Sequence, residues 1–217
     1  AGTKTVSVQP HGETQRYNLT ANIAVVVATG STHFVPPIPG IESLVEGIQL
    51  WNNRDAVSAN TIPRHLIILG AGAVGSEMAT FYAAIGSKVT LISSTSEILP
   101  KVEPEAAKIV RNALEANGVS VKLSSHVTKV QKHSNSSLSV NLSDGQVITG
   151  SVLLNVTGRR PRTFDLGLES IGLVGEGQPL EIDASFAVPA LRNAESWLYA
   201  VGDVNGLAPT THMGRYQ

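Results

Sequence analysis

Three glycines, Gly70, Gly72 and Gly75, stand at the G-x-G-x-x-G spacing of a phosphate-binding turn. In such a turn the first glycine permits a tight bend and the second lets the backbone approach a pyrophosphate. The third allows a helix to pack closely against a strand. Unpaired N–H groups at the start of that helix carry about half a positive charge, which favours an anion. The spacing therefore predicts a site for the pyrophosphate of a dinucleotide.

The segments around these glycines have the lengths and order that such a turn requires. An apolar run at 66–69 is typical of a parallel strand buried on both faces, and a helical pattern extends from the turn to Gly86. A second strand is predicted at 88–92. Because glycine turns also occur in ordinary loops, a purely structural βαβ unit is the competing interpretation, but the complete unit favours a dinucleotide site.

Residues 63–155 are predicted to form one nucleotide-binding domain. Helical spacing of apolar residues predicts a helix over 103–117, with Pro104 in its first turn and Gly118 after its end. The fold class is therefore predicted to be α/β, a Rossmann-like domain with a three-layer βαβ core plus a β-meander. The further strands are expected at 119–123, 127–131, 138–142 and 147–154, with 152–156 forming the strand that leaves the domain.

The flanking segments carry two more turns that could meet a ligand. A nearly continuous apolar strand at 22–28 is followed by Thr29 and Gly30, and a strand at 197–201 is followed by Gly202 and Asp203. The carboxyl ends of strands are where α/β folds bind ligands, and a carboxylate there can accept hydrogen bonds from a polyol. For each feature alone, a simple turn is the competing interpretation. A short hairpin is predicted before residue 20, and a proline-rich connection at 32–63.

The composition excludes several classes of protein. The 217 residues carry a formal net charge of −1, so we expect no nucleic-acid partner. No apolar run approaches the ~20 residues of a membrane helix and no signal-peptide pattern is present, so we expect no membrane span and a cytoplasmic location. The sequence has no cysteine, which excludes a disulfide, a thiolate zinc site and a redox-active dithiol within these residues. The six histidines are not at metal-ligand spacing, and no metal site is predicted.

Taken together, four motifs resemble those of one family. They are Ala28-Thr29-Gly30-Ser31, the segment from Gly70 to Glu77, Thr157-Gly158-Arg159-Arg160-Pro161, and Tyr199-Ala200-Val201-Gly202-Asp203-Val204 followed by Thr211-His212. In order and spacing the chain resembles the flavoprotein pyridine nucleotide-disulfide oxidoreductases, the group of dihydrolipoamide dehydrogenase, glutathione reductase and mercuric reductase. The resemblance implies a parent enzyme that passes hydride from NAD(P)H to FAD and on to a disulfide, quinone or metal acceptor.

The resemblance also implies features that this sequence lacks. Members of the family carry an N-terminal FAD fingerprint, a Cys-x4-Cys redox pair and a C-terminal interface domain, through which we expect the parent to form a homodimer. We therefore expect the chain to be the middle of a longer protein. It would consist of FAD-domain segments at 1–62 and 156–217 around the NAD(P) domain, and would bind nucleotide without turnover. The alternative is a stand-alone dinucleotide-binding or sensor module without catalytic activity.

The resemblance implies cofactor-binding residues but no catalytic residue within the chain. Glu77 would face the edge where nicotinamide and flavin meet; a first-turn acid that stabilises the helix dipole is the competing interpretation. Gly70, Gly72, Ala73, Val74 and Gly75 would hold the pyrophosphate, Val127 would lie near the adenine, and Gly158 and Arg159 would line the nicotinamide pocket. On the flavin side would lie Thr29, Gly30, Gly202, Asp203, Thr211 and His212.

The choice between NADH and NADPH depends on the end of the second strand. NAD sites place an acid there and NADP sites place an arginine nearby, but here Ser93 and Ser94 follow the strand. Hydroxyl groups form weaker hydrogen bonds than charged groups do, so discrimination should be weak. We expect the site to accept both coenzymes.

Overall fold

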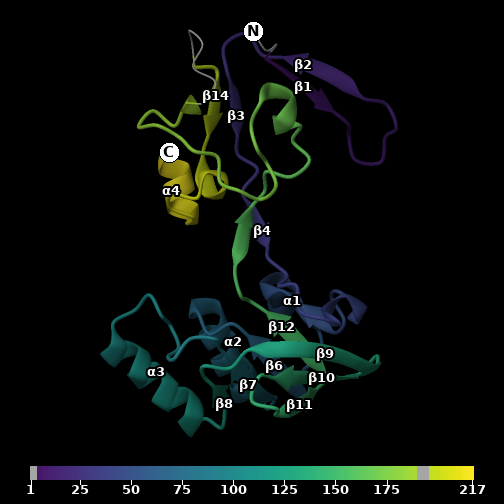
Figure 1. Ribbon diagram of the computed structural model, residues 1–217, viewed down its shortest axis with the longest axis vertical. Coiled ribbons are helices and arrows are strands. Elements are labelled where there is room, and N and C mark those ends of the chain that lie inside the picture. Colours follow the sequence, from purple (N-terminus) through teal and green to yellow (C-terminus); the bar gives the residue numbers. More distant parts are fainter. Residues whose placement is uncertain (1–3, 190–195) are drawn as a thin grey trace. The chain divides into compact units, whose positions relative to one another are not determined.

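The computed structural model describes residues 4–189 and 196–217 (Figure 1). Two compact units are present, one made of Ala1–Thr32 with Arg159–Gln217 and the other of His33–Gly158. The second unit therefore begins earlier than the predicted boundary at residue 63. The reason is that Ile41 and Leu50 from the proline-rich connection are buried in a hydrophobic core of this unit.

The unit His33–Gly158 is built on a parallel sheet of five strands in the order β5-β12-β6-β7-β8. This sheet and its βα connections confirm the predicted α/β class. Its strands are β5 (Leu50–Trp51), β6 (His65–Leu69), β7 (Lys88–Ile92), β8 (Ser120–Lys122) and β12 (Val152–Asn155).

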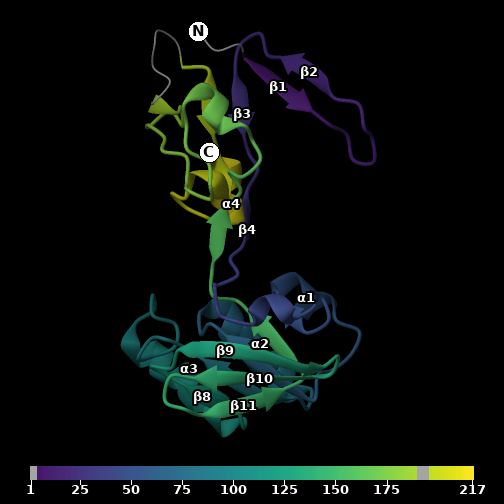
Figure 2. The same cartoon turned by 45° about the vertical axis from the view of Figure 1, so that its right-hand side comes forward.

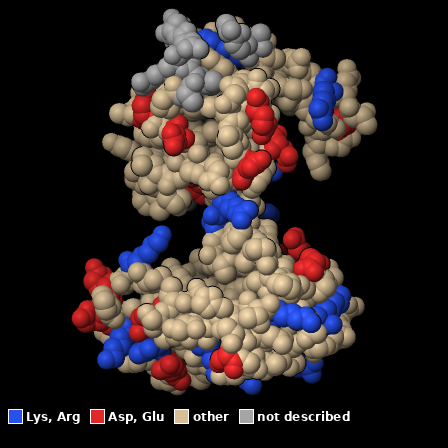
Figure 3. Space-filling view, viewed as in Figure 1, with Lys and Arg blue, Asp and Glu red and all other residues tan. Residues whose placement is uncertain are grey.

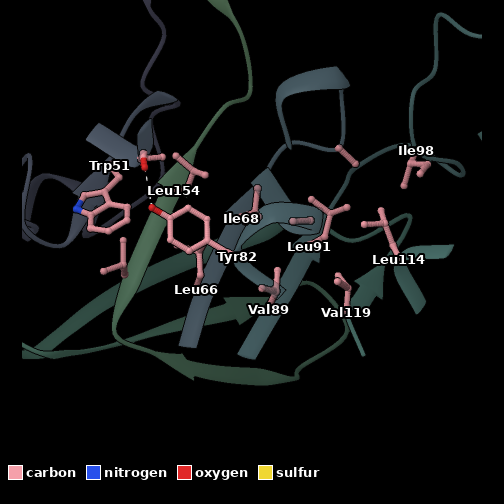
Figure 4. Packing of buried hydrophobic residues seen from close by; sticks show 14 residues of the cluster. Trp51, Leu66, Ile68, Tyr82, Val89, Leu91, Ile98, Leu114, Val119 and Leu154 are labelled. Atoms are coloured by element: carbon pink, nitrogen blue, oxygen red, sulfur yellow. Dashed lines mark hydrogen bonds between the residues drawn. The ribbon is translucent and has the colours of Figure 1, made fainter. Parts of the chain in front are cut away.

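Helices cover one face of the sheet. Leu66 and Ile68 of β6 point to this side and pack in one core with Tyr82 (Figure 4). The Tyr82 hydroxyl donates a hydrogen bond of 2.7 Å to the carbonyl oxygen of Ala56, which joins two of the helices. The helices are α1 (Asn53–Ser58), α2 (Ala73–Ala84) and α3 (Pro104–Ala116).

An antiparallel meander covers the other face (Figure 2). The alternate residues of β6, Ile67 and Leu69, pack in a second core with Val130 and Val140 of the meander. The unit therefore has three layers, helices, parallel sheet and meander, so the predicted meander is itself the third layer and is not an addition to a three-layer core. The meander strands are β9 (Val127–Ser134), β10 (Ser137–Leu142) and β11 (Val147–Gly150).

The apolar run at 147–154, predicted as one strand, is divided between two sheets. Residues 147–150 form β11 of the meander, whereas 152–155 form β12 of the parallel sheet. Ser151 makes the transition, and its backbone N–H and hydroxyl both donate to the carbonyl oxygen of His65. Val147 and Thr149 of the first half are exposed, whereas all four residues of β12 are buried, and the sequence pattern alone did not reveal this division.

The other unit contains the predicted hairpin, β1 (Thr5–Val8) with β2 (Tyr17–Thr20). The strand predicted at 22–28 is shorter, β3 (Val25–Val27), and pairs in parallel with β14 (Leu198–Ala200). Val26 remains 57% exposed because β3 has one neighbouring strand in the described part of the chain.

Short elements complete the description. These are β4 (Ser31–His33), which neighbours β13 (Arg159–Pro161), the 3-10 turns η1 (Ile41–Ser43), η2 (Leu168–Ile171) and η4 (Gly202–Asn205), and α4 (Thr211–Tyr216). Acidic and basic side chains are interspersed on the face shown in Figure 3, in line with the near-neutral net charge. Among the helices of residues 4–189 and 196–217, none is long and apolar enough to cross a membrane.

His65, at the start of β6, makes the stability of its unit pH-dependent. Burial and the neighbouring Lys88 lower the pKa of its imidazole, although a backbone hydrogen bond at Thr149 opposes this shift. The folded state therefore favours the neutral ring, which lies 2.9 Å from the hydroxyl of Thr90. In the unfolded chain the imidazole titrates near its ordinary pKa of about 6.5. We expect stability to be unaffected by this group above that pH and to decrease as the pH falls below it.

Thermal unfolding measured between pH 8 and pH 5.5 tests this expectation. The variant His65→Gln, which keeps a polar side chain near Thr90 but cannot titrate, should have a weaker decrease in Tm toward acid pH. His11→Gln, in the exposed hairpin, is the matched control and should behave as the original protein. Equal pH dependence in all three proteins would contradict the role of His65.

Candidate functional site

The glycine turn connects β6 to α2, and its three glycines have different surroundings. Gly70 has a φ of +111°, and a Cβ there would lie 2.7 Å from the carbonyl oxygen of Val156. A Cβ on Gly75 would lie 1.9 Å from the carbonyl oxygen of Gly70. A Cβ on Gly72 would have no atom within 4 Å. Gly70 and Gly75 are thus required by close packing, whereas Gly72 leaves open space at the turn.

The start of α2 presents unpaired backbone N–H groups beside this space. Gly72 is the N-cap residue and makes no side-chain capping bond, and Ala73 and Val74 begin the helix. The first turn contains no acidic residue. The interpretation of Glu77 as a first-turn acid is therefore wrong, because the helix begins at Ala73 and places the exposed Glu77 in its second turn. Such a helix start can bind an anion through its free N–H groups.

A groove of about 420 Å³ lies against the glycine turn, entirely within the unit His33–Gly158. This volume lies within the usual range for small-molecule sites. The groove brings together Gly70, Gly72, Ser93, Ser94 and Val127, which the sequence predicted as cofactor contacts. Gly158 follows Thr157, which lines the groove.

Sequence reasoning missed several residues of this groove. Thr95, Ser125 and His126 belong to its lining, and so do Pro36, Ile38 and Pro100. Thr95, Ser125 and His126 follow closely on the ends of β7 and β8, neighbouring parallel strands. The rule that ligands bind at the carboxyl edge of a parallel sheet could have found them.

Asn155 does not line the groove but is bound to Thr157, which does, and it was also missed. It ends β12 and is 3% exposed. Its side-chain Nδ2 donates to the carbonyl oxygen of Phe34 at 2.7 Å, and its Oδ1 accepts a hydrogen bond from the Thr157 hydroxyl at 2.8 Å. A polar residue within an otherwise apolar strand was the available signal. Asn155 therefore holds Thr157 in place at the groove.

A second group of predicted residues meets in the other unit. The Ser31 hydroxyl donates to Oδ2 of Asp203 at 2.5 Å, and Arg159 donates from Nε to the Ser31 hydroxyl at 2.6 Å. Arg159 also donates from Nη2 to the Ser31 carbonyl oxygen at 2.6 Å. The Arg159 side chain, predicted for the nicotinamide pocket, is thus bound to Ser31 beside Asp203. Oδ1 of Asp203 has no hydrogen-bond partner among residues 4–189 and 196–217.

The remaining residues predicted for the flavin side occupy turns of the same unit. The Thr29 hydroxyl donates to the Arg162 carbonyl oxygen, and Gly30 accepts from the backbone N–H of Arg162. Gly202 has a φ of +77° and donates its N–H to the side chain of Gln217 at 2.8 Å.

His212 lies in α4, and its imidazole is 3.5 Å from the hydroxyl of Thr210. Thr211 begins α4, and its side chain lies outside the described part of the structure. The hydrogen bonds of the described residues do not join His212 to Asp203.

The chain is similar to known proteins along its whole length. A family model described as pyridine nucleotide-disulphide oxidoreductase matches residues 1–217. A dihydrolipoyl dehydrogenase of Buchnera aphidicola is 34% identical over 193 residues, which is 86% of this chain and 38% of that protein. An NAD(P)H dehydrogenase (quinone) of Mycobacterium tuberculosis is 29% identical over 194 residues, covering 89% of this chain and 37% of the relative.

Solved structures show the same likeness. The HOCl-induced flavoprotein disulfide reductase RclA from Escherichia coli superimposes with a TM-score of 0.82 and 28% identity, over 96% of this chain and 45% of that one. LpdA from Mycobacterium tuberculosis gives a TM-score of 0.81 at 25% identity, over 99% of this chain and 47% of that one. The chain spans less than half the length of these relatives.

Proposed function

Because this chain belongs to the pyridine nucleotide-disulphide oxidoreductase family, we propose that its residues 33–158 bind NADH or NADPH as part of an FAD-dependent oxidoreductase. The observation that carries the proposal is the open space at Gly72, at the start of a helix and in the lining of a groove of about 420 Å³. In the complete enzyme, NAD(P)H would supply a hydride to the flavin, and the electrons would pass on to a disulfide, quinone or metal acceptor.

Residues of the groove and of α2 beside it would contact different parts of the dinucleotide. The N–H groups of Ala73 and Val74 at the start of α2 would donate to the pyrophosphate. Val127, in the lining of the groove, would offer an apolar contact to the adenine. Glu77, exposed on the second turn of α2, would lie toward the nicotinamide. None of these residues would form or break a covalent bond. Their role would be to bind and orient the dinucleotide.

The unit of Ala1–Thr32 with Arg159–Gln217 would contact the sugar-alcohol part of a flavin. Asp203 keeps one carboxylate oxygen on Ser31 and leaves Oδ1 available to accept a hydrogen bond from a ribityl hydroxyl. Arg159 would hold Ser31 in the orientation that this arrangement needs. The sequence has no cysteine that could receive electrons, so we expect these 217 residues to bind nucleotide without turnover. The parent would act on its acceptor as a homodimer.

Titration of the purified chain with NADH and NADPH by calorimetry tests the proposal. We expect both to bind, with dissociation constants that differ by less than about a hundredfold, because no charged residue lines the groove to read the 2′ position. An absorbance spectrum recorded in parallel reports bound flavin. Binding of neither nucleotide would reduce the glycine turn to a structural feature and overturn the proposal.

A further inference from the structure

Backbone strain in the unit that holds the groove is concentrated in the loops beside it. All residues of this unit are described, and Leu99 and Ser124 are its only residues other than glycine with a positive φ, +49° and +49°. They directly precede Pro100 and Ser125, which line the groove. A left-handed backbone is unfavourable for a residue with a Cβ and persists only where its surroundings impose it. Ser124 joins two loops by donating its N–H to the carbonyl oxygen of Thr95, whereas Leu99 reaches the glycine turn.

Leu99 is bound directly to this turn. Its backbone N–H donates to the carbonyl oxygen of Ala71, the residue between the first two glycines, at 2.8 Å. Its own carbonyl oxygen accepts from the N–H of Val102 at 2.9 Å. The side chain of Leu99 packs against the same hydrophobic core as Ala71, which is 4% exposed. These contacts hold Leu99 in its left-handed conformation.

The bond from Leu99 sets the direction of the next donor along the turn. The peptide bond between Ala71 and Gly72 is trans. In a planar trans peptide the carbonyl oxygen and the following N–H point in opposite directions. Because the Ala71 carbonyl oxygen faces Leu99, the Gly72 N–H points away from Leu99. This N–H makes no hydrogen bond with any residue that the structure describes, and Gly72 lines the groove. A free donor of fixed direction is therefore present at the groove.

We propose that Leu99 is a positioning residue, which keeps the Gly72 N–H available to the pyrophosphate of the coenzyme. This assignment rests on the proposed function and adds a donor to those of Ala73 and Val74. If the peptide between Ala71 and Gly72 turned over, this donor would be withdrawn. The partly negative carbonyl oxygen would then stand beside the phosphates and repel them. Leu99 opposes that rotation, because it holds the carbonyl oxygen on the other side.

The competing interpretation is that Leu99 only fills space in the core. The two roles place opposite demands on the residue at this position. Packing favours an apolar side chain, whereas a left-handed backbone favours asparagine or glycine and disfavours a β-branched residue such as valine. Leu99→Val therefore keeps much of the packing and loses the conformation. Leu99→Asn keeps the conformation and loses the apolar packing.

Calorimetric titration with NADH and with NADPH compares these variants. Leu99→Val should weaken the binding of both coenzymes by about tenfold and leave the ratio of their dissociation constants unaltered, because both contain the pyrophosphate. Leu99→Asn should lower Tm but bind each coenzyme within about threefold of the original chain. Leu114→Val is the matched control: it makes the same exchange in the same core, within α3. It should lower Tm and change neither dissociation constant by more than about threefold.

A measurement on the unaltered chain does not depend on how any variant folds. When NADH is added, the amide proton of Gly72 should shift downfield in a proton–nitrogen correlation NMR spectrum, because it begins to donate to a charged oxygen. In the chain without nucleotide, the amide proton of Leu99 should exchange slowly with solvent, since it is held by Ala71.

Three results would overturn the assignment. They are undiminished binding by Leu99→Val, an equal loss of affinity in Leu99→Asn and Leu99→Val, and an unmoved Gly72 amide proton while NADH binds. In each of these cases the unaltered chain still binds the coenzyme, so the proposed function stands. If the unaltered chain binds neither coenzyme, the proposed function itself has failed, and this assignment fails with it.

Discussion

Replacing Gly72 by alanine is expected to weaken the binding of NADH and NADPH by about a hundredfold while the protein stays folded. Gly72 has a φ of −77°, which any residue can adopt, and an added Cβ has no protein atom within 4 Å. The methyl group would therefore disturb nothing in the protein. It would stand in the groove at the point where the pyrophosphate approaches the backbone.

Calorimetric titration of the Gly72→Ala variant, with a thermal unfolding curve of the same sample, measures both halves of this expectation. The stability cost of alanine at an N-cap occupied by glycine should be below about 1 kcal/mol, or about 4 °C in Tm. Dissociation constants within about threefold of the original would show that the pyrophosphate does not approach this backbone.

Adding the same methyl group three residues further on, at Gly75, should destabilise the fold. At Gly72 it should block nucleotide binding instead. In Gly75→Ala the new Cβ would meet the carbonyl oxygen of Gly70 at 1.9 Å and the carbonyl carbon at 3.0 Å. Both are backbone atoms of the tight turn and cannot rotate away. We expect the free energy of unfolding of the unit His33–Gly158 to fall by about 3 kcal/mol, with Tm lower by about 10 °C.

Urea unfolding followed by the fluorescence of Trp51 gives a direct measurement. Trp51 is buried in the core beside α2, and removing the second tryptophan by Trp197→Phe leaves it as the reporter of this unit. Gly72→Ala in the same background is the matched control, since it adds the same group to the same turn. An unchanged urea midpoint in Gly75→Ala, with nucleotide binding lost, would place the role of Gly75 at the ligand instead.

The elements around the glycine turn could be predicted closely because local signals define their ends. Gly86 has a φ of +94° just after α2, and Pro104 begins α3 while Gly118, with a φ of +81°, follows it. β7 has the predicted bounds, and β6 begins one residue earlier, at His65. Each of these boundaries depends on residues close in the sequence, so each can be predicted without the tertiary structure.

Elements determined by distant contacts could not be predicted in the same way. β5 has two residues and exists because β12, far along the chain, pairs with it. The capping box of α1, in which Asn52 and Asp55 exchange hydrogen bonds, could have been predicted from the spacing of these two residues. The sequence shows no apolar periodicity there to draw attention to it.

The residues of the candidate site also fall into two sets, those that local motifs predict and those that distant contacts place. The glycines, Ser93 and Ser94 follow from a motif and its strand, and the structure brings them to one groove. His126 reaches this groove because β8 pairs with β7, and Asn155 supports it through a hydrogen bond to Phe34. The hydrogen bonds from Arg159 to Ser31 could not be predicted, because the two residues lie far apart in the sequence. Local sequence patterns do not predict which distant segments of the chain pair with each other.

The position of β12 has a consequence for the synthesis of the protein. β12 is the last strand of its unit to be made, yet it lies between β5 and β6, and Val156 directly after it provides the wall against which Gly70 closes. A nascent chain that already contains the glycine turn therefore still has an open edge along β6. Because chains grow by about 5–20 residues per second, this edge of unpaired backbone N–H and C=O groups stays open for several seconds before β12 is made. The groove is therefore completed late in translation, because Val156 and Thr157 of its lining follow β12.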